Sequence, residues 1–209
     1  MTAVSGEWLA GRLAGPARDF AVSIPRVASD LLARYADLLL EWGARVNLTG
    51  ARTPEALTDE HLADALAFFP RLPREAFRFV DVGSGAGLPG LVIALLRPDA
   101  QAVLLEPTQK KCRFLVHAIR ALDLADRIEA RPERLADHLL RGGRSAYEVA
   151  ISRAVWPASD WLGLGAPLLK PSGVLLGVEG SEPGELPVGA VRHRYRLGKR
   201  TRAVIELRC

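Results

Sequence analysis

The sequence predicts an α/β fold: a doubly wound, mostly parallel sheet that follows an N-terminal helical extension and ends in an antiparallel hairpin. Three observations indicate this. The first 75 or so residues carry apolar side chains at helical spacing, the middle of the chain alternates β-rich runs with helical segments, and the end holds two β-rich runs around a glycine. Alternating β and α units are typical of a parallel sheet with helices on both faces.

The N-terminal extension, residues 1–75, is predicted to be helical. One helix starts at Pro25, since proline is favoured in the first helical position, and apolar residues then recur at steps of three and four. A second helix starts near Pro54 with Thr53 as its N-cap, and a proline-rich break ends it. The following domain is expected to cover residues 76–209.

The elements of that domain follow from the alternation of the two patterns. Strands are expected at residues 79–82, 102–105, 127–130, 147–152 and 173–178. Helices are expected at residues 88–96, 109–122, 133–140 and 158–169. The closing hairpin is expected to pair residues 191–197 with residues 202–207 across a turn at 198–201.

Composition excludes several classes of protein. With 49% hydrophobic and 25% charged residues, the chain can form a core, which argues against disorder. The longest uncharged stretch, Val82 to Leu96, is too short and too rich in glycine for a membrane span. No secretory signal is visible, and the two cysteines cannot form a disulfide framework or a zinc site alone. We therefore expect a cytoplasmic protein. We also expect a monomer and no metal ion.

Charge is concentrated near the end of the sequence. Between Arg192 and Arg208 there are seven Lys/Arg residues and one Glu, while the rest of the chain sums to about −2. A basic segment on a near-neutral body suggests an anionic polymer such as RNA as a partner. Protection of an exposed sheet edge is the alternative.

The segment with the clearest chemical meaning is FVDVGSGAGLPG, residues 79–90. An apolar strand leads through Asp81 into three alternating glycines and then a helix, so a ligand can lie against bare backbone. The spacing is not that of a dinucleotide site, because Leu88 occupies the place of the third glycine, and no P-loop lysine follows. A plain strand-to-helix turn is the alternative. The glycines are Gly83, Gly85 and Gly87.

Two further strand ends carry candidate ligand residues. Glu106 ends the second strand, 23 residues after Gly83, where a carboxylate is placed to accept hydrogen bonds from ribose hydroxyls. After the third strand, Pro132 and Glu133 could lie against an adenine edge. Glu133 is equally consistent with an acidic residue in the first turn of a helix.

Together these features resemble the class I S-adenosylmethionine methyltransferases, which have a Rossmann-like sheet. Five motifs narrow the resemblance to the RsmG (GidB) family of small-subunit ribosomal RNA guanine-N7 methyltransferases, over roughly residues 32–180. In chain order they are VNLT at 46–49, HLAD at 61–64, DVGSGAGLPG at 81–90, KKCRFL at 110–115 and ISRA at 151–154.

The resemblance implies S-adenosylmethionine as cofactor and methyl transfer to N7 of a guanine in 16S ribosomal RNA. It implies that Arg153 lines the place where cofactor and target meet. The residues implied in cofactor binding are Gly83, Gly85 and Leu88 for the methionine part, Glu106 for the ribose, Pro132 and Glu133 for the adenine, and in addition Asp81, Gly87 and Arg153. The basic candidates for RNA phosphates are Lys110, Lys111, Arg113, Arg194, Arg196, Lys199 and Arg200.

The chain departs from the family pattern at two points. Ala65 stands where the family often has serine, and Glu179 and Gly180 stand where it often has Lys-Gly. The loss of that lysine puts RNA contacts of the loop in doubt. His61 and Asp64 are expected either to join the helical extension to the sheet or to contribute to the pocket.

The residue types also suit guanine N7 chemistry. N7 has an exposed lone pair and no proton to remove, so alignment and electrostatics are sufficient and no general base is expected. The fourth strand ends in Ser-Arg-Ala, without the Pro-Pro-aromatic turn of amino-group methylation, and Cys112 is expected to be a buried or lateral helix residue rather than a nucleophile. The alternatives are a methyltransferase for a small molecule or protein, a non-catalytic RNA-binding assembly factor and, more distantly, a nicotinamide dehydrogenase.

Overall fold

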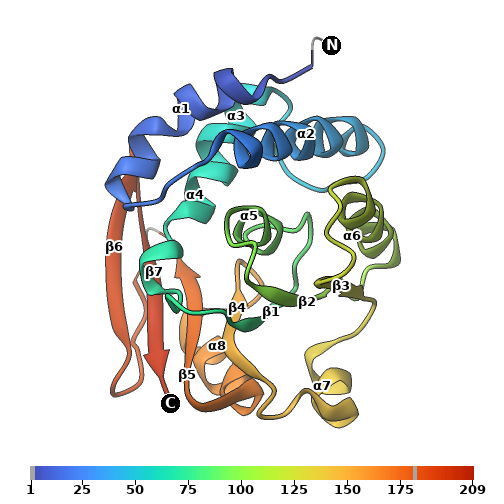
Figure 1. Ribbon diagram of the computed structural model, residues 1–209. Coiled ribbons are helices and arrows are strands. Elements are labelled where there is room, and N and C mark those ends of the chain that lie inside the picture. Colours follow the sequence, from blue (N-terminus) through green and yellow to red (C-terminus); the bar gives the residue numbers. More distant parts are fainter. Residues whose placement is uncertain (1–2, 181–182) are drawn as a thin grey trace.

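The computed structural model describes residues 3–180 and 183–209. It contains a seven-stranded sheet in the order β3-β2-β1-β4-β5-β7-β6. Strands β1 to β5 are parallel to one another, and β7 pairs antiparallel with both β5 and β6 (Figure 1). The strands are β1 Arg78–Val82, β2 Gln101–Leu105, β3 Ile128–Arg131, β4 Tyr147–Ser152, β5 Leu169–Glu179, β6 Val191–Leu197 and β7 Arg200–Arg208.

Helices cover both faces of this sheet. Residues on the opposite faces of β1, β2, β4, β5 and β7 enter two separate cores, as expected for strands buried on both faces, whereas the edge strands β3 and β6 contribute to one core. In Figure 1, α5 and α6 lie on one face and α7 and α8 on the other. Their bounds are α5 Gly90–Leu96, α6 Gln109–Ala121, α7 Leu135–His138 continued by η3 Leu139–Gly143, and α8 Ala158–Gly165 continued by η4 Ala166–Leu168. The doubly wound α/β fold is confirmed.

The N-terminal helices pack over α5 and share its hydrophobic core rather than forming a separate one (Figure 1). Apolar residues of α2 and α4, such as Leu32, Leu39 and Leu66, lie in the same cluster as Leu91 and Phe114. The division at 75/76 remains a prediction, since the two regions are continuous through this core. The elements are α1 Gly6–Asp19, α2 Arg26–Gly43, α3 Pro54–Leu57, η1 Thr58–Leu62, α4 Ala63–Leu66 and η2 Phe69–Arg71.

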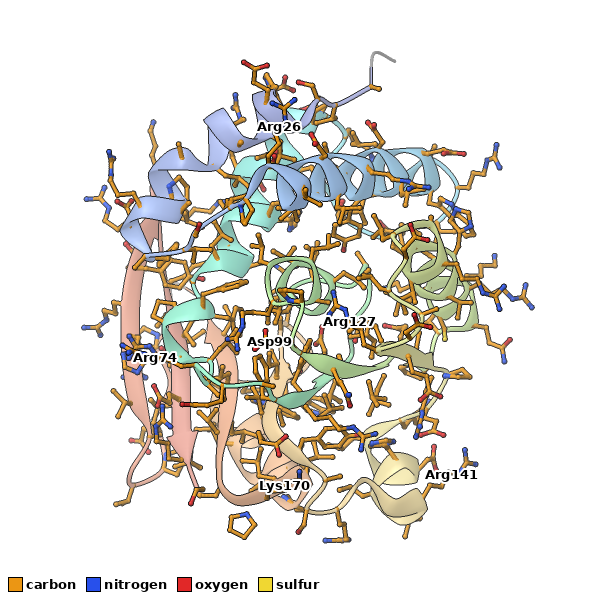
Figure 2. All side chains as sticks on the ribbon, in the orientation of Figure 1. Arg26, Arg74, Asp99, Arg127, Arg141 and Lys170 are labelled. Carbon is orange, nitrogen blue, oxygen red and sulfur yellow. The ribbon has the colours of Figure 1, made fainter. Side chains whose placement is uncertain are left out.

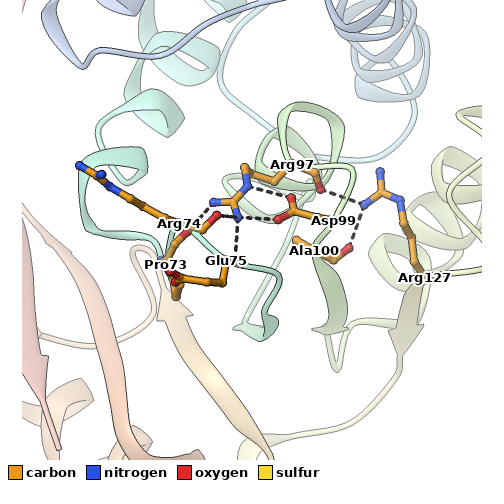
Figure 3. A network of polar contacts seen from close by, with 7 residues as sticks. All are labelled: Pro73, Arg74, Glu75, Arg97, Asp99, Ala100 and Arg127. Carbon is orange, nitrogen blue, oxygen red and sulfur yellow. Dashed lines mark hydrogen bonds and ion pairs between the residues drawn. The ribbon is translucent and has the colours of Figure 1, made fainter.

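A polar network fastens the extension to the sheet at the predicted boundary (Figure 3). The Arg97 guanidinium donates to the backbone oxygens of Pro73, Arg74 and Glu75 and pairs with Asp99 at 2.7 Å. Arg127 donates to three further carbonyls, those of residues 94, 97 and 100, at 2.6 to 3.3 Å. In the view of Figure 2, Asp99 and Arg127 lie near the centre of the drawing, where Asp99 is exposed at the surface, whereas Arg141 lies at the outer side of α7.

Most predicted elements overlap the observed ones, and three details were wrong. Pro25 is the N-cap of α2 and has an extended ψ of 155°, so the helix begins one residue later. The helix expected at 158–169 ends earlier, because Leu169 already pairs with Tyr147 as the first residue of β5. The hairpin turn is shorter than expected, because Arg200 pairs with Leu197. The separate helix α1 was not predicted.

Candidate functional site

The main cleft lies where three parallel strands end. Gly83, Glu106 and Arg153 directly follow β1, β2 and β4, and all three line a cleft of about 1240 Å³. Chain order reverses between β1 and β4, and ligands of open α/β sheets bind outside the carboxyl ends of strands at such a point. The hairpin residues 199–202 and two residues of the extension, Leu48 and His61, complete the wall.

The glycine loop has the conformation that its sequence predicts. Gly83, Gly85 and Gly87 have φ values of +74°, +56° and +87°, which L residues rarely adopt. A Cβ at Gly83 would lie 2.3 Å from a Val155 methyl, and one at Gly87 would lie 2.6 Å from Leu91. At Gly85 the nearest such contact is a backbone oxygen at 3.8 Å. The loop is therefore packed on its outer glycines and open at the middle one, where a ligand can approach the backbone.

The Asp81 side chain contacts the residue at the end of this loop, where α5 begins, and does not line the cleft. Its Oδ2 accepts a hydrogen bond from the Gly90 backbone N–H at 3.0 Å, and its Oδ1 has no hydrogen-bond partner among the described residues. Burial raises the pKa of Asp81 to about 7, against the Gly90 hydrogen bond, which lowers it. The expected direct role in ligand binding thus becomes a role in holding the start of α5 under the loop.

Glu106 faces the cleft in a fixed orientation. Its two carboxylate oxygens accept hydrogen bonds from the Gly85 N–H at 2.9 Å and the Thr108 N–H at 2.7 Å. The side chain is buried, and each oxygen keeps a lone pair for a further donor. A carboxylate held in this way is suited to accept hydrogen bonds from two neighbouring hydroxyl groups.

A second, smaller pocket of about 460 Å³ adjoins the cleft and shares Gly83, Pro107 and Val155 with it. Its other walls are mainly apolar, and Glu133 lies at its edge. His138 and Arg141 hold the Glu133 carboxylate at 3.0 Å, and these hydrogen bonds outweigh the effect of burial, so the pKa of Glu133 is lowered. Pro132 is exposed and lines neither pocket. The mainly apolar lining of this pocket, with one carboxylate, suits a heteroaromatic ring.

The arginine after β4 is tied to the helical extension. The Arg153 guanidinium donates to Asp64 Oδ2 at 3.0 Å, and Asp64 is fully buried. His61, one turn earlier, lines the cleft, and burial together with the positive charge of Arg153 lowers the pKa of its imidazole. The two alternatives for this motif are therefore not exclusive, since it joins extension to sheet at the wall of the cleft.

The basic candidates fall into two groups. Lys111, Lys199 and Arg200 line the cleft, whereas Lys110 and Arg113 are exposed outside it on α6. On β6, exposed arginines alternate with Tyr195 and Leu197, which pack against the core. This alternation directs Arg194 and Arg196 to the outer face of the edge strand, away from the cleft lining.

The departures from the family pattern have clear structural settings. Ala65 is buried in the main core, where a serine hydroxyl would require a hydrogen-bond partner. Glu179 does not line the cleft: its carboxylate pairs with Arg192 and accepts from the Gly184 N–H, whereas Gly180 does line the cleft.

Sequence reasoning missed several residues of the site. The Tyr35 hydroxyl of α2 donates to the Ala86 carbonyl of the glycine loop at 2.6 Å. Tyr195 and Arg202 of the hairpin both donate to Asp64. Tyr35, on the apolar face of a predicted helix, was the only one of these residues that the sequence could have singled out, because the contacting residues are far apart in the chain. Cys112 is buried, and burial raises the pKa of its thiol, which agrees with a packing role.

The part of the chain that the structure describes has neither a metal-site cluster nor a membrane-spanning helix. Among residues 3–180 and 183–209, no cluster of histidine, cysteine or carboxylate side chains has the arrangement of a metal site. In the same part of the chain, no helix is both long and apolar enough to cross a membrane.

Comparisons with known proteins agree with this geometry. A family model described as rRNA small subunit methyltransferase G matches residues 28–187. A protein of that name from Frankia casuarinae is 36% identical over 168 residues, which are 77% of this chain and 63% of the relative. One from Rubrobacter xylanophilus is 38% identical over 192 residues, 90% of this chain and 69% of the relative. The chain thus spans just under two thirds of the Frankia relative.

The fold has a counterpart among solved structures. A SAM-dependent methyltransferase from Aquifex aeolicus superposes with a TM-score of 0.54 at 12% identity, covering 72% of this chain and 92% of that one. At this level of identity the likeness supports the fold alone.

Proposed function

The chain belongs to the rRNA small subunit methyltransferase G family, and on this premise we propose that it transfers a methyl group from S-adenosylmethionine to N7 of a guanine in 16S ribosomal RNA. The observation that supports this most strongly is the cleft at the ends of β1, β2 and β4, which combines an open glycine loop, a fixed carboxylate and an arginine. The enzyme would act in the cytoplasm, and we propose that it acts as a monomer.

The described residues fit the proposed cofactor part by part. Gly83, Gly85 and Leu88 would hold the methionine part, because the middle of the loop is open to an approaching ligand. Glu106 would accept hydrogen bonds from the ribose hydroxyls. The adjoining apolar pocket, with Glu133 at its edge, would take the adenine. When bound, the cofactor supplies an electrophilic methyl group on a sulfonium.

The proposed reaction requires little from the protein beyond alignment of guanine N7 with the methyl group of the cofactor. Guanine N7 is nucleophilic without loss of a proton, so the site needs no base with a tuned pKa. Among the described residues that line the cleft there is no cysteine to serve as a covalent nucleophile. The role proposed for Arg153 is to position the target base beside the cofactor.

Lysines at the cleft are the best candidates for RNA phosphates. Lys111 on α6 and Lys199 in the hairpin turn line the cleft, and within the described chain neither has an ion-pair partner at 4.0 Å or closer. Arg200, by contrast, is paired with Glu60 at 3.0 Å. Unpaired cations gain most from a phosphate, because no existing interaction has to be broken.

The test is identification of the methylated nucleoside. The protein is incubated with methyl-labelled S-adenosylmethionine and small ribosomal subunits that lack N7-methylated guanine, and the digested RNA is separated into nucleosides. Label in 7-methylguanosine supports the proposal, and a Gly85→Asp variant serves as the inactive control. Cofactor binding without label in RNA would refute the proposed acceptor and favour a methyltransferase with another substrate.

A further inference from the structure

Asp64 lies at the junction of three chain segments beside the cleft. Its side chain is fully buried on α4. One oxygen, Oδ2, accepts from the Arg153 guanidinium at 3.0 Å and from the Arg202 guanidinium at 2.8 Å. The other oxygen, Oδ1, accepts from the Tyr195 hydroxyl at 2.7 Å. A single carboxylate thus joins the turn after β4 to both strands of the hairpin.

Both arginines depend on this carboxylate and both line the cleft. Their side chains are 15% and 26% exposed, and within the described residues Asp64 is the ion-pair partner of each. Two guanidinium groups held this close repel one another unless an anion lies between them. Loss of the carboxylate would leave two half-buried positive charges without a counterion, and both side chains would move.

The negative charge of Asp64 affects the proposed reaction as well as the positions of the two arginines. The cofactor carries a positive sulfonium, and methylation at N7 leaves a positive charge on the guanine. Lys111, Lys199 and Arg200 also line the cleft, so unneutralised arginines would oppose cofactor, product and one another. A buried carboxylate behind the two guanidiniums lowers the positive potential, yet leaves their other N–H groups available to the target nucleotide.

We propose that Asp64 is a positioning residue for methyl transfer, which fixes Arg153 and Arg202 on the cleft wall and offsets their charge. The proposal rests on the proposed function. Tyr195 completes the arrangement, because its hydroxyl fixes the second carboxylate oxygen, and its ring packs edge-on against Phe20 at 5.5 Å. Asp64 of the extension thereby holds Arg153, and the hairpin in turn holds Asp64.

The test compares Asp64→Asn with Asp59→Asn. Both remove one negative charge from the same helical region, but Asp59 is half exposed and pairs with Arg12 on α1 outside the cleft. Asp64→Asn is expected to lower the single-turnover rate at saturating cofactor and RNA by about 10- to 100-fold, the scale for a misaligned reacting group. Its Kd for S-adenosylmethionine by calorimetry should rise by a smaller factor than the rate falls, since the glycine loop and Glu106 are intact and only the unneutralised charge of the arginines opposes the sulfonium.

A second readout is independent of turnover. Side-chain NMR signals of Arg153 and Arg202 should show ordered guanidiniums in the parent protein and in Asp59→Asn, and mobile ones in Asp64→Asn. A purely structural role predicts lower thermal stability with an unchanged rate per folded molecule, and that result would overturn the proposal. Ordered guanidinium signals in Asp64→Asn would overturn it too.

A variant that fails to fold and a failure of the proposed function each require a different readout. If Asp64→Asn does not fold, Tyr195→Phe removes one hydrogen bond to the Asp64 carboxylate and leaves every charge in place. It should lower the single-turnover rate about threefold, a fraction of what one hydrogen bond to a charged group is worth, because both ion pairs of Asp64 remain. An unchanged rate in that variant would contradict the proposal. If the parent protein does not methylate ribosomal RNA, the proposed function fails, and the NMR comparison still decides whether Asp64 orders the arginines.

Discussion

Replacing Asp81 by Asn is expected to stabilise the cofactor-free protein at pH 8 and to leave its stability unchanged near pH 4. The carboxyl group is buried, its Oδ1 has no hydrogen-bond partner in the part of the chain that the structure describes, and burial raises its pKa from 3.8 to about 7. Between pH 4 and 7, Asp81 therefore keeps its proton in the folded state, whereas in the unfolded chain it has already released it. The free energy of unfolding falls as the pH rises through this window and then stays level.

The size of the effect follows from the two pKa values. Each pKa unit corresponds to about 1.4 kcal/mol, so the rise from 3.8 to about 7 amounts to about 4 kcal/mol at pH 8. Asparagine has no charge to lose, and its carbonyl oxygen can still accept from the Gly90 N–H. The variant should therefore lack this decline in stability and gain most of that amount at pH 8.

Urea unfolding followed by tryptophan fluorescence at several pH values measures the difference between parent and variant. Asp99→Asn is a control of opposite sign: its hydrogen bond from Arg97 lowers the pKa of Asp99, so this variant should lose stability at neutral pH and approach the parent in acid. Parallel stability curves for the parent and Asp81→Asn would refute the reasoning, because they would mean that Asp81 ionises alike in both states.

Four further changes test the site and its support. Gly85→Asp should abolish S-adenosylmethionine binding in calorimetry, because residue 85 has a φ of +56° and the new carboxylate would lie in ligand space beside Glu106; unchanged affinity would contradict the role of the loop. Glu106→Gln should raise the Kd for S-adenosylmethionine by about 10- to 100-fold, the scale for a charged hydrogen bond, and an effect on RNA affinity alone would show that the residue has another role. Arg127→Met should lower the free energy of unfolding by about 2 to 4 kcal/mol, because three backbone carbonyls lose their donor; a urea midpoint equal to that of the parent would contradict this. Changing Lys111 and Lys199 together to Gln should reduce the salt dependence of RNA binding by about 1.4 to 1.8 in log–log slope, whereas an equal slope would exclude them as phosphate contacts.

Much of the fold and half of the site could be predicted because the signals are local. The glycine loop, Glu106 and Arg153 each directly follow a strand, and parallel strands bring their carboxyl ends together at one edge. A predicted strand therefore also locates the residue after it. The alternation of β and α units likewise predicted helices on both faces of the sheet, and the structure has a hydrophobic core on each face.

The remainder depends on register and on distant partners. The basic hairpin reads as one charged segment, yet the alternation of β6 sends Arg194 and Arg196 outward, whereas Lys199 lies in the turn at the cleft. Asp64 meets Tyr195 and Arg202 across 131 and 138 residues of sequence, a distance over which no pattern in the sequence carries information. Asp81 was expected at the ligand because its position in the motif does not reveal which way its side chain points.

The position of β7 also bears on how the protein is made. β7 is the last strand in sequence but lies between β5 and β6, so β5 and β6 have no contact through the ladder until β7 is inserted. During synthesis the glycine loop and Glu106 leave the ribosome long before Arg202, and the edge of β5 stays open until then. The residues proposed to bind the cofactor can thus be in place in a nascent chain before residues 199–202 complete the wall of the cleft.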